Sequence, residues 1–562
     1  MHYRWILPGP ASRSLAARLA AEFRVSPLAG SVLARQGLVD SADIEPFLRP
    51  LLKQLSDPFQ LPEMRAAVER IDLALRHKER IVLYGDYDVD GVASLAVLGR
   101  LLRAYGGNVE CFLPHRIDEG YGLSAAGVER CFEEWSPQLL IAVDCGTNSV
   151  AEVAEMRRRG AEVIIVDHHE YAGTRPDCVA LVNPKLKGEF TYLCSAGLAF
   201  KVAHALLKHS PLPDFDLREM LDLVALATLA DLVPLVAENR LLVRKGLEQM
   251  RVTRWPGLAA LMVEAGVKTP VRSSDVGFQL GPRINAAGRL GTAQAALRLL
   301  LTNDRAEAAQ LAAQLNRQNA ERRGVEQLVV REAEAWVRDH FDPRHNASIV
   351  AGQRDWHDGV LGIVASRLSR RHYRPTLIVG FNAEGSGKGS GRSIDGLCLV
   401  TALTRCGAHL EKFGGHEMAA GLSLREENFP VFREAFEQAA REMLSDEMLI
   451  PSLSIDAEMK LDDVDFPAID DQDLLEPYGT GNRQPLCLVR GVTPSGAPRV
   501  LKEKHLRFDF QHGRRRIVAI FFDGASQELP RPPWDIAFRL ERNEFNGRVD
   551  PQMQIVAIRA AA

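Results

Sequence analysis

The stretch 81-IVLYGDYDVDG-91 joins an apolar run to three aspartates at alternating positions, and it decides how the first half of the chain is interpreted. The apolar run is typical of a buried strand. Asp86, Asp88 and Asp90 lie so close together that their carboxylates repel one another unless each is solvated or paired. If the chain stays extended up to Asp90, the side chains of Asp88 and Asp90 face the same way, and Gly91 lets a helix begin after them. The open question is what neutralises the three acids.

Further apolar runs of the same kind follow, and they alternate with helical stretches such as 92–104 and 149–159. The runs are 81-IVLYG, 109-VECFLP, 139-LLIAVD, 163-VIIVD and 179-VALVN. Strands that are apolar throughout and alternate with helices predict a parallel sheet covered on both faces. Asp86, Asp144 and Asp167 each end one of these strands. Because ligands bind at the carboxyl ends of strands in open α/β sheets, we expect these three acids at one edge.

Composition sets broad limits on the class of protein. The chain has 562 residues, of which 46% are hydrophobic and 25% charged, as in ordinary globular proteins, and about 150 residues per domain gives three or four domains. The formal net charge of −4 gives no indication of a polyanion partner, so a nucleic-acid site would have to be a local basic patch. The eight cysteines form no CxxC pair, which suits reduced thiols. Without a signal peptide pattern or an apolar run of about 18 residues, a cytoplasmic protein is expected.

The pattern along the chain divides it into five parts. We expect a helical segment at 1–60, a catalytic α/β domain at 61–240, a helical connector at 241–344, a smaller α/β domain at 345–445 and a β domain at 451–562. Within the connector, 271–292 reads as loop-rich and 304–340 as one long helix. Five or six short strands in the last part predict a small oligonucleotide-binding-type barrel or a small sandwich.

Four pieces of the predicted catalytic domain carry oxygen or imidazole ligands at a strand or helix end: 86-DYDVDG, 143-VDCG, 166-VDHH and the aspartate of 227-ATLAD. Mixed carboxylate and histidine ligands suit Mn²⁺ or Mg²⁺, and two such ions about 4 Å apart would activate a water and hold a phosphoryl group. An acidic structural turn is the alternative for the first piece alone. A calcium loop is excluded, because its twelfth position requires glutamate and here holds Val97.

These motifs resemble those of the DHH phosphoesterase superfamily, named for the Asp-His-His of 167-DHH. A longer set of motifs is similar to that of its RecJ branch of single-strand-specific DNA exonucleases: 112-FLPHRIDEGYGLS, 183-NPK, 281-GPRINAAGR, 357-HDGVLGIVASRL, 389-GSGRSI and 414-GGHEMAAG. The stretches 478-YGTGNRQPLC and 543-NEFNG are similar to the oligonucleotide-binding domain of that branch. The resemblance runs from about residue 30 to residue 558.

The resemblance implies a set of site residues. The metal ligands it implies are Asp88, Asp90, Asp144, His168 and Asp231, with Asp86 as a less certain member. Asp144, His168 and His169 are the implied catalytic residues, with His169 orienting a ligand or touching the scissile phosphate. Smaller enzymes of the superfamily carry a histidine four residues before the first metal aspartate, where this chain has Tyr84. That departure makes Asp86 a candidate for the missing ligand.

Substrate contacts are expected from two glycine-rich regions. In the smaller α/β domain, Lys388, Arg392 and Ser393 lie near the 414-GGHEMAAG stretch, whose Gly414, Gly415 and His416 suit a phosphate-binding surface. The alternative for that stretch is a tight strand-to-helix turn with a packed histidine. In 281-GPRINAAGR the candidates are Arg283, Asn285 and Arg289, and the alternative is an arginine-capped loop.

The terminal β domain supplies arginines for backbone contacts and phenylalanines for stacking. The arginine candidates are Arg507, Arg542, Arg548 and the run 512-HGRRR, and the aromatic candidates are Phe508, Phe510, Phe521, Phe522 and Phe545. Most of these aromatic side chains are expected in the core instead. The basic run is equally consistent with a solvated hairpin.

The resemblance implies an α/β architecture in three parts. These are a parallel-sheet DHH domain, a smaller α/β DHH-associated domain joined to it by a long helix, and an oligonucleotide-binding-like β-barrel at the end. The expected function is metal-dependent hydrolysis of single-stranded DNA from the 5′ end to mononucleotides, in repair and recombination. Expected partners are single-stranded DNA, a single-strand-binding protein and a helicase, with a monomeric enzyme. The alternatives are a phosphoesterase for short oligonucleotides or other small phosphoesters, and a non-catalytic single-strand-binding protein.

Overall fold

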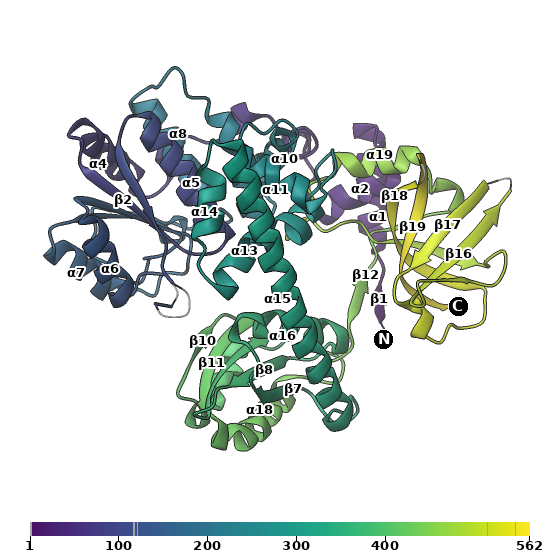
Figure 1. Cartoon of the computed structure of the whole chain (residues 1–562). Helices are drawn as coiled ribbons and strands as arrows, with labels where there is room; N and C mark the ends of the chain where they lie inside the picture. Colours follow the sequence, from purple (N-terminus) through teal and green to yellow (C-terminus); the bar gives the residue numbers. More distant parts are fainter. Residues whose placement is uncertain (1–2, 116–118, 121, 514, 546, 562) are drawn as a thin grey trace. The chain divides into compact units, whose positions relative to one another are not determined.

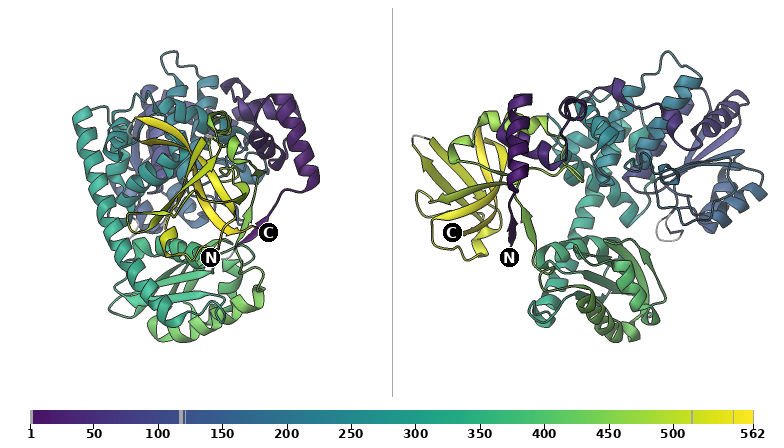
Figure 2. Two further views of the ribbon diagram at one scale, coloured as in Figure 1. Left: turned by 90° about the vertical axis from the view of Figure 1, so that its right-hand side faces the viewer. Right: turned by 180° about the vertical axis from the view of Figure 1, so that it is seen from behind.

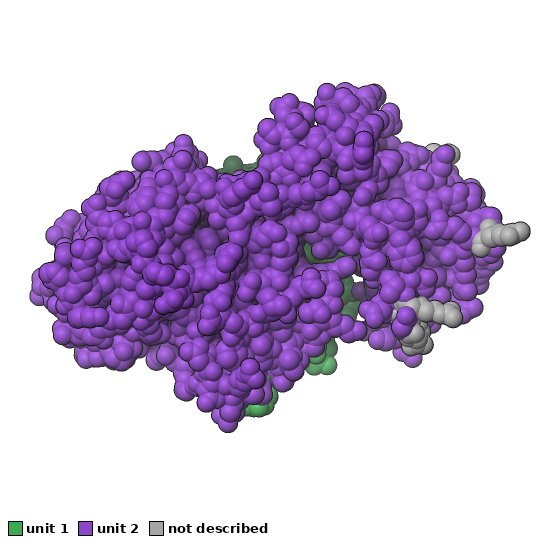
Figure 3. Space-filling view, turned by 90° about the horizontal axis from the view of Figure 1, so that it is seen from above, with its two compact units in different colours: residues 1–4, 316–453 green, residues 5–315, 454–562 purple. Residues whose placement is uncertain are grey.

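The computed structural model describes residues 3–115, 119–120, 122–513, 515–545 and 547–561. The chain forms two compact units, which Figure 3 colours separately. The larger unit consists of residues 5–315 and 454–562, and the smaller unit consists of residues 1–4 and 316–453. Each unit has its own sheets and helices (Figure 1, Figure 2).

A five-stranded parallel sheet lies at the centre of the catalytic part of the larger unit, as the apolar runs predict. Its strand order is β3-β2-β4-β5-β6. The strands are β2 (Arg80–Gly85), β3 (Asn108–Phe112), β4 (Leu139–Val143), β5 (Glu162–Val166) and β6 (Ala180–Val182). In register, Val143 of β4 pairs with Gly85 of β2 and with Val166 of β5. The three central strands therefore end level with one another, and the residue that follows each of them is an aspartate.

Helices cover both faces of this sheet. Ile81 and Leu83 point into a core shared with α4, α5 and α8, whereas Val82 and Tyr84 point into a second core shared with α6 and α7. The bounds are α4 (Met64–Arg76), α5 (Val89–Ala104), α6 (Ala125–Trp135), α7 (Val150–Arg158) and α8 (Ser195–His209). The alternation of side chains along β2 explains why its whole run is apolar.

The segments on either side of the catalytic part are also helical. The first 50 residues form α1 (Pro10–Phe23), α2 (Pro27–Arg35) and α3 (Ser41–Leu48), as predicted, after the short strand β1 (Arg4–Ile6). After the sheet come α9 (Leu221–Ala230), α10 (Ala237–Met250), α11 (Pro256–Ala265), α12 (Ser273–Asp275), the π-helix η5 (Val276–Leu280), α13 (Gly281–Leu290) and α14 (Gln294–Leu301).

The prediction that 271–292 is loop-rich was wrong. Glycine and proline are typical of loops, but Pro282 lies in the first turn of α13, directly after η5, and does not interrupt the helical run. Gly288 lies in the same helix because its Cα packs against the backbone of Tyr87, where a Cβ would meet the Tyr87 carbonyl oxygen at 3.1 Å. The glycine therefore marks a close contact between α13 and the turn at Tyr87, which lies between β2 and α5.

The terminal part of the larger unit is a seven-stranded sheet with the order β13-β14-β18-β19-β17-β16-β15. Its elements are β13 (Ala457–Glu458), α19 (Phe466–Leu474), β14 (Cys487–Val492), β15 (Arg499–Leu501), β16 (His505–His512), β17 (Arg515–Phe521), β18 (Trp534–Phe545) and β19 (Arg548–Ala560). Five or six strands were predicted. Among the described residues no pairing joins the outer strands β13 and β15, so the sheet is open and not a closed barrel.

The smaller unit packs helices around a five-stranded sheet of order β10-β11-β9-β8-β7. The long helix predicted at 304–340 is α15 (Arg305–His340), which runs from the larger unit into the smaller one. The other elements are β7 (Ile349–Arg354), α16 (Asp358–His372), β8 (Thr376–Phe381), β9 (Ser386–Arg392), α17 (Leu399–Arg405), β10 (Lys412–Gly415), β11 (Ala419–Arg425) and α18 (Phe429–Met443), and β12 (Ser452–Ser454) pairs with β1.

All eight cysteines are free thiols. Within the described part of the chain, every helix is too short or too polar to cross a lipid bilayer.

A buried carboxylate, Asp222, lies in the first turn of α9. It accepts hydrogen bonds from the Leu223 amide (2.7 Å), the Thr253 hydroxyl (2.6 Å) and the Trp255 indole (3.2 Å). Burial raises the pKa of Asp222 to about 7, although these hydrogen bonds and the nearby Arg100 act in the opposite direction. The folded protein therefore holds a proton at Asp222 that the unfolded chain releases near its ordinary pKa of 3.8.

We expect Asp222→Asn to gain stability relative to wild type as the pH rises. The folded pKa lies above the unfolded pKa, so wild type loses stability between about pH 4 and pH 7, whereas asparagine does not titrate. One pKa unit corresponds to about 1.4 kcal/mol, so the difference between the two proteins should change by about 2–3 kcal/mol between pH 5 and pH 8. Unfolding measured by circular dichroism across this range tests the expectation, and a difference that stays constant with pH would contradict it.

Candidate metal centre

Three aspartates follow directly after three neighbouring strands of the parallel sheet. Asp86 follows β2, Asp144 follows β4 and Asp167 follows β5, and all three are almost completely buried. The prediction that they lie at one edge of the sheet is confirmed. Asp144 has a φ of 63°, a left-handed conformation that costs a residue with a side chain about 1–3 kcal/mol. This backbone turn accompanies a hydrogen bond from the Ser195 hydroxyl to Oδ1 of Asp144, at 2.9 Å.

The sequence predicted a chain that stays extended up to Asp90, and this prediction was wrong. Helix α5 begins at Val89, and Asp88 caps it by accepting hydrogen bonds from the amides of Asp90 (2.8 Å) and Gly91 (3.1 Å). Gly91 is required for a different reason from the one expected. A Cβ at Gly91 would lie 2.3 Å from the carbonyl oxygen of Asp86, so the first turn of α5 can approach the strand end only with glycine there.

Asp90 points from the first turn of α5 towards the start of a second helix. Its carboxylate accepts hydrogen bonds from the amides of Ser195 (2.7 Å) and Ala196 (2.8 Å), which open α8. The amides at a helix amino terminus favour a negative charge. Asp90 is thereby fixed in place while its oxygens remain beside His168.

His168 lies between carboxylates from three different segments. Its Nε2 is 3.4 Å from Oδ1 of Asp144, 3.8 Å from Oδ2 of Asp231 and 3.9 Å from Oδ2 of Asp90. Asp231 reaches this position from the end of α9, which stops at Ala230. Ligand atoms of the predicted metal residues therefore converge from β4, α5, α9 and the segment after β5.

The ligand atoms fall into three overlapping groups whose members all lie within 4.8 Å of one another. The groups are Asp86 with Asp88 and Asp144, Asp90 with His168 and Asp231, and Asp144 with His168 and His169. Asp144 belongs to two groups, which is the arrangement expected of a carboxylate shared by two ions. All six residues predicted as metal ligands appear in these groups.

Asp167 contacts both histidines of the site, a role that the sequence did not predict. Its Oδ1 accepts hydrogen bonds from the His168 amide (2.8 Å) and pairs with Nδ1 of His169 (2.7 Å), and its Oδ2 accepts from the Thr147 amide (3.0 Å). Asp167 therefore holds the two histidines instead of facing the other carboxylates. A buried acid preceding two histidines was a signal for this role, but spacing alone does not separate a ligand from the residue that orients one.

The crowding of carboxylates shifts their pKa values. Burial, followed by the charges of Asp90 and Asp88, raises the pKa of Asp144 well above its usual range and that of Asp231 to about 8. Burial and Asp90 also raise the pKa of Asp88. Burial lowers the pKa of His168, so its ring is neutral and able to bind a metal. A cation among these groups would restore the ionised carboxylates.

His169 differs from His168. Burial acts to lower its pKa, but the hydrogen bond and charge of Asp167, together with Asp231 and Asp90, outweigh it and raise the pKa to about 9. The ring is held through Nδ1.

The donor set fits Mn²⁺ or Mg²⁺. The converging atoms are carboxylate oxygens and imidazole nitrogens, the ligands that suit these ions. Cys145 and Cys194 lie nearby, but burial and the neighbouring carboxylates raise the pKa of both thiols well above the usual value. Protonated thiols do not form a zinc-thiolate site.

Tyr84 points to the face of the sheet that α6 and α7 cover. It is fully buried in the core beneath α6, and its hydroxyl donates to the carbonyl oxygen of Gly122 at 3.2 Å. A ligand in place of the superfamily histidine must therefore come from elsewhere, and Asp86 is already grouped with Asp88 and Asp144.

One substrate candidate touches the metal-ligand segment. Oδ1 of Asn285, in α13, accepts a hydrogen bond from the Val89 amide at 3.2 Å, so α13 lies against the start of α5. Arg283 donates to the carbonyl oxygen of Gln279 at 2.7 Å. Arg289 is partly buried on the same helix. The alternative of an arginine-capped loop was wrong, because these residues form helix α13.

The remaining substrate candidates lie in the smaller unit. Lys388 is exposed on β9 and pairs with Asp358, whereas Arg392 donates to the Gly391 carbonyl oxygen at 2.7 Å. Ser393 is buried, and its hydroxyl donates to the Leu397 carbonyl oxygen at 2.7 Å. Gly414 and Gly415 are the last residues of β10, His416 opens the turn of the β10–β11 hairpin, and all three are exposed. The turn therefore joins two strands, not a strand and a helix.

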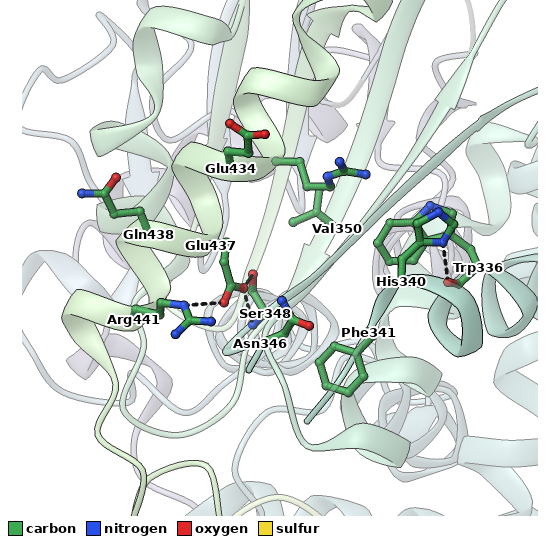
Figure 4. A pocket seen from close by; sticks show the side chains of 11 residues that line it. Trp336, His340, Phe341, Asn346, Ser348, Val350, Glu434, Glu437, Gln438 and Arg441 are labelled. Carbon is green, nitrogen blue, oxygen red and sulfur yellow. Dashed lines mark hydrogen bonds and ion pairs between the residues drawn. The ribbon is translucent and has the colours of Figure 1, made fainter. Parts of the chain in front are cut away.

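A separate cavity of about 400 Å³ lies in the smaller unit, between the end of α15, the start of β7 and α18 (Figure 4). Its acidic residue Glu437 accepts hydrogen bonds from the Ala347 and Ser348 amides and from Arg441. The Trp336 and His340 rings are stacked at 4.7 Å. Glu437 is therefore held in place by backbone amides and by Arg441.

In the terminal sheet, the expectation that most aromatic candidates are core residues is confirmed. Phe508, Phe510 and Phe521 are buried, and Phe522 is exposed. Arg507 and Arg516 both lie beside Asp509, and Arg542 pairs with Asp470. Arg514 and the side chains of Phe545 and Arg548 lie outside the described residues.

We expect Asp144→Asn to remove most of the stabilisation that a divalent metal gives the protein. Removing one of several mutually repelling carboxylates should raise the melting temperature in EDTA, while the gain from added Mn²⁺ should largely disappear. A ligand at about 100 times its dissociation constant stabilises a protein by about 2.7 kcal/mol, which thermal unfolding detects easily. Asp523→Asn, on an exposed carboxylate, is the control. Equal Mn²⁺ shifts in Asp144→Asn and wild type would contradict the assignment.

Family models match three parts of the chain. The DHH family N-terminal domain matches residues 80–228, the DHHA1 domain matches residues 346–442, and the RecJ OB domain matches residues 455–557.

Comparison with curated proteins and solved structures covers the whole chain. It is 36% identical over 561 residues to the single-stranded-DNA-specific exonuclease RecJ of Bacillus subtilis, spanning 98% of this chain and 70% of that protein. It is 35% identical over 542 residues to RecJ of Thermus thermophilus, spanning 96% of this chain and 76% of that protein. The crystal structure of Thermus thermophilus RecJ with Mn²⁺ superimposes with a TM-score of 0.85 at 33% identity, covering 100% of this chain and 80% of that one. The chain therefore belongs to the RecJ family of single-stranded-DNA-specific exonucleases.

Proposed function

We propose that this protein is a metal-dependent exonuclease that hydrolyses phosphodiester bonds in single-stranded DNA. The observation that carries the proposal is the convergence on His168 of carboxylates from three segments, in a chain related over nearly its full length to RecJ exonucleases. A phosphodiester substrate suits such a site, because divalent cations neutralise both the carboxylates and the phosphate.

We propose a role for each residue of the site from its position. Asp86, Asp88, Asp90, Asp144, His168 and Asp231 are the proposed metal ligands. Two divalent cations held there would activate a water for attack on the scissile phosphorus and stabilise the developing charge. Ser195 positions Asp144, and Asp167 fixes Nδ1 of His169, which leaves Nε2 as the atom of His169 for a ligand or the phosphate.

The proposed substrate contacts form two sets, one in each unit. Asn285 lies beside the start of α5, and Arg283 and Arg289 share its helix. In the smaller unit we propose Lys388, Arg392 and the hairpin turn with Gly414, Gly415 and His416. Ser393 was a candidate, but its hydroxyl is used inside the fold, so we assign it to holding the segment after β9.

The proposal extends to organisation and biological role. We propose domains at 61–240 for catalysis, 345–445 for the DHH-associated part and 451–562 for nucleic-acid binding, with 1–60 and 241–344 as helical segments around them. We also propose 5′-to-3′ processive digestion to mononucleotides in repair and recombination, by a monomer in the cytoplasm. A single-strand-binding protein and a helicase are the proposed partners.

We expect Asp144→Asn to abolish nuclease activity while leaving the fold intact. Asp144 belongs to two ligand groups, so its loss should lower the rate by at least about a hundredfold. End-labelled single-stranded DNA with Mn²⁺ or Mg²⁺, resolved on denaturing gels, measures the rate. Asp523→Asn should digest as wild type does. Undiminished digestion by Asp144→Asn would remove the basis for the metal site.

We expect polarity and substrate length to separate this function from that of a small-substrate phosphoesterase. A 5′ label should appear at once as mononucleotide, whereas a 3′ label should stay on shortening strands. A long single strand should be degraded in preference to a dinucleotide, because an enzyme for small phosphoesters needs no terminal β domain. Faster cleavage of the dinucleotide would favour the alternative, and early release of the 3′ label would reverse the proposed polarity.

A further inference from the structure

The stretch 478-YGTGN forms a tight turn between α19 and β14, in the terminal part of the larger unit. The amide of Gly479 donates to the carbonyl oxygen of Asn482 at 2.9 Å, and the amide of Asn482 donates back to Gly479 at 3.1 Å. We call residues 478–482 the YGTGN turn. Although it belongs to the terminal β domain in sequence, it packs on the catalytic part of the same unit.

The YGTGN turn contacts the segment that follows the proposed ligand Asp231. The Leu235 amide donates a hydrogen bond to the carbonyl oxygen of Thr480 at 2.8 Å. A Cβ at Gly481 would lie 3.3 Å from Cβ of Pro234 and 3.4 Å from Cγ1 of Val236. The turn therefore lies directly on residues 234–236, and the absence of a side chain at Gly481 permits this approach.

Residues 232–236 have little secondary structure of their own to hold them. Helix α9 ends at Ala230, and Leu232 has a φ of 61° and an exposed side chain. Beyond it, Asn239 donates to the carbonyl oxygen of Pro234 at 3.0 Å, and Leu235 is buried. The hydrogen bond from Leu235 to the YGTGN turn is thus one of few fixed points for the chain that leaves Asp231.

Asp231 depends more on its backbone than Asp90 and Asp144 do. Asp90 accepts two helix amides and Asp144 accepts the Ser195 hydroxyl, whereas the buried Oδ2 of Asp231 has no hydrogen-bond partner among the described residues. Its side chain is 23% exposed, against 1% for Asp90 and 3% for Asp144. Since no hydrogen bond among the described residues holds Oδ2, the backbone on both sides of Asp231 contributes to its position.

The YGTGN turn is itself firmly anchored. The buried side-chain amide of Asn482 donates to the carbonyl oxygens of Leu475 (2.9 Å) and Pro477 (2.8 Å). Arg240 of α10 donates to the carbonyl oxygens of Leu475 (3.0 Å) and Glu476 (2.9 Å). The turn is therefore a rigid support and not a mobile loop tip.

We infer that the YGTGN turn is a positioning element of the metal centre. It holds the segment after Asp231 and so keeps the Asp231 carboxylate beside His168 and Asp90. Gly481 and Asn482 are positioning residues in this inference, because they act through Asp231 and touch no substrate. The inference rests on the proposed function, since it takes Asp231 as a metal ligand.

The test compares two glycines of the same domain in the full-length protein. Gly481 has a φ of 76° and a neighbouring segment at its Cβ position, whereas Gly491 in β14 has a φ of 61° and no atom of the described residues within 4 Å of that position. Alanine at either site imposes a similar backbone strain, but only Gly481→Ala presses on residues 234–236. Gly481→Val enlarges the same effect, and Gly481→Ala keeps the test valid if the valine variant does not fold.

Calorimetric titration with Mn²⁺ in the absence of DNA gives the main measurement. We expect Gly481→Ala to bind Mn²⁺ about tenfold or more weakly than wild type, and Gly491→Ala to bind as wild type does. Binding of single-stranded DNA in EDTA should not change, and raising the Mn²⁺ concentration should restore the kcat of Gly481→Ala. A role confined to general stability would produce neither the affinity change nor the rescue by metal.

Two results would overturn the inference. Equal Mn²⁺ affinities for Gly481→Ala and Gly491→Ala would show that the turn does not act on the metal centre. Weaker DNA binding by Gly481→Ala with unchanged Mn²⁺ affinity would make the turn a DNA contact. In both cases wild type would still bind Mn²⁺ and digest DNA, so the proposed function would stand. A wild-type protein that neither bound Mn²⁺ nor digested DNA would overturn the proposed function as well.

Discussion

Mutual repulsion among buried carboxylates is the constraint on which the rest of the catalytic part depends. Level strand ends bring Asp86, Asp144 and Asp167 to one edge, where burial raises the electrostatic cost of every negative charge. The fold offsets part of this cost with backbone amides, which Asp90 and Asp167 receive from the starts of nearby segments. Asp144 instead has a raised pKa, because burial and the charges of Asp90 and Asp88 oppose its ionisation, and a bound cation would lower this pKa. The negative charge that the backbone amides do not offset would favour the binding of a divalent cation.

The sheet and its acidic edge could be predicted because both follow from local patterns. Apolar runs alternating with helices specify parallel strands, and parallel strands place the residues after Gly85 and Val143 side by side. The turn after Asp86 could not be predicted in this way. It depends on the approach of Gly91 to the Asp86 carbonyl oxygen, a contact between two backbones that no periodicity records.

The difference between local patterns and contacts in space also explains which site residues could be predicted and which could not. The family motifs identify the acids that converge, but Asp167 and Asp144 are equivalent in sequence, as acids that end neighbouring strands. Only the structure shows that Asp167 turns to His169. In the terminal sheet, Phe508 and Phe510 are buried because alternate positions of β16 face the core, which the spacing of the strand already indicated.

The terminal β domain is built into the catalytic part and is not merely tethered to it. Arg240 is buried between them, and burial lowers its pKa to about 9, yet it remains charged at neutral pH and donates to several carbonyl oxygens of 474–477. A buried cation is costly unless its hydrogen bonds are made, so this contact is stable only when both parts are in place. The segment after Asp231 also contacts the terminal β domain, because the Leu235 amide donates a hydrogen bond to the carbonyl oxygen of Thr480. Asp231, whose Oδ2 accepts no hydrogen bond within the described part of the chain, thus takes its rigidity from a domain whose fold suggests nucleic-acid binding alone.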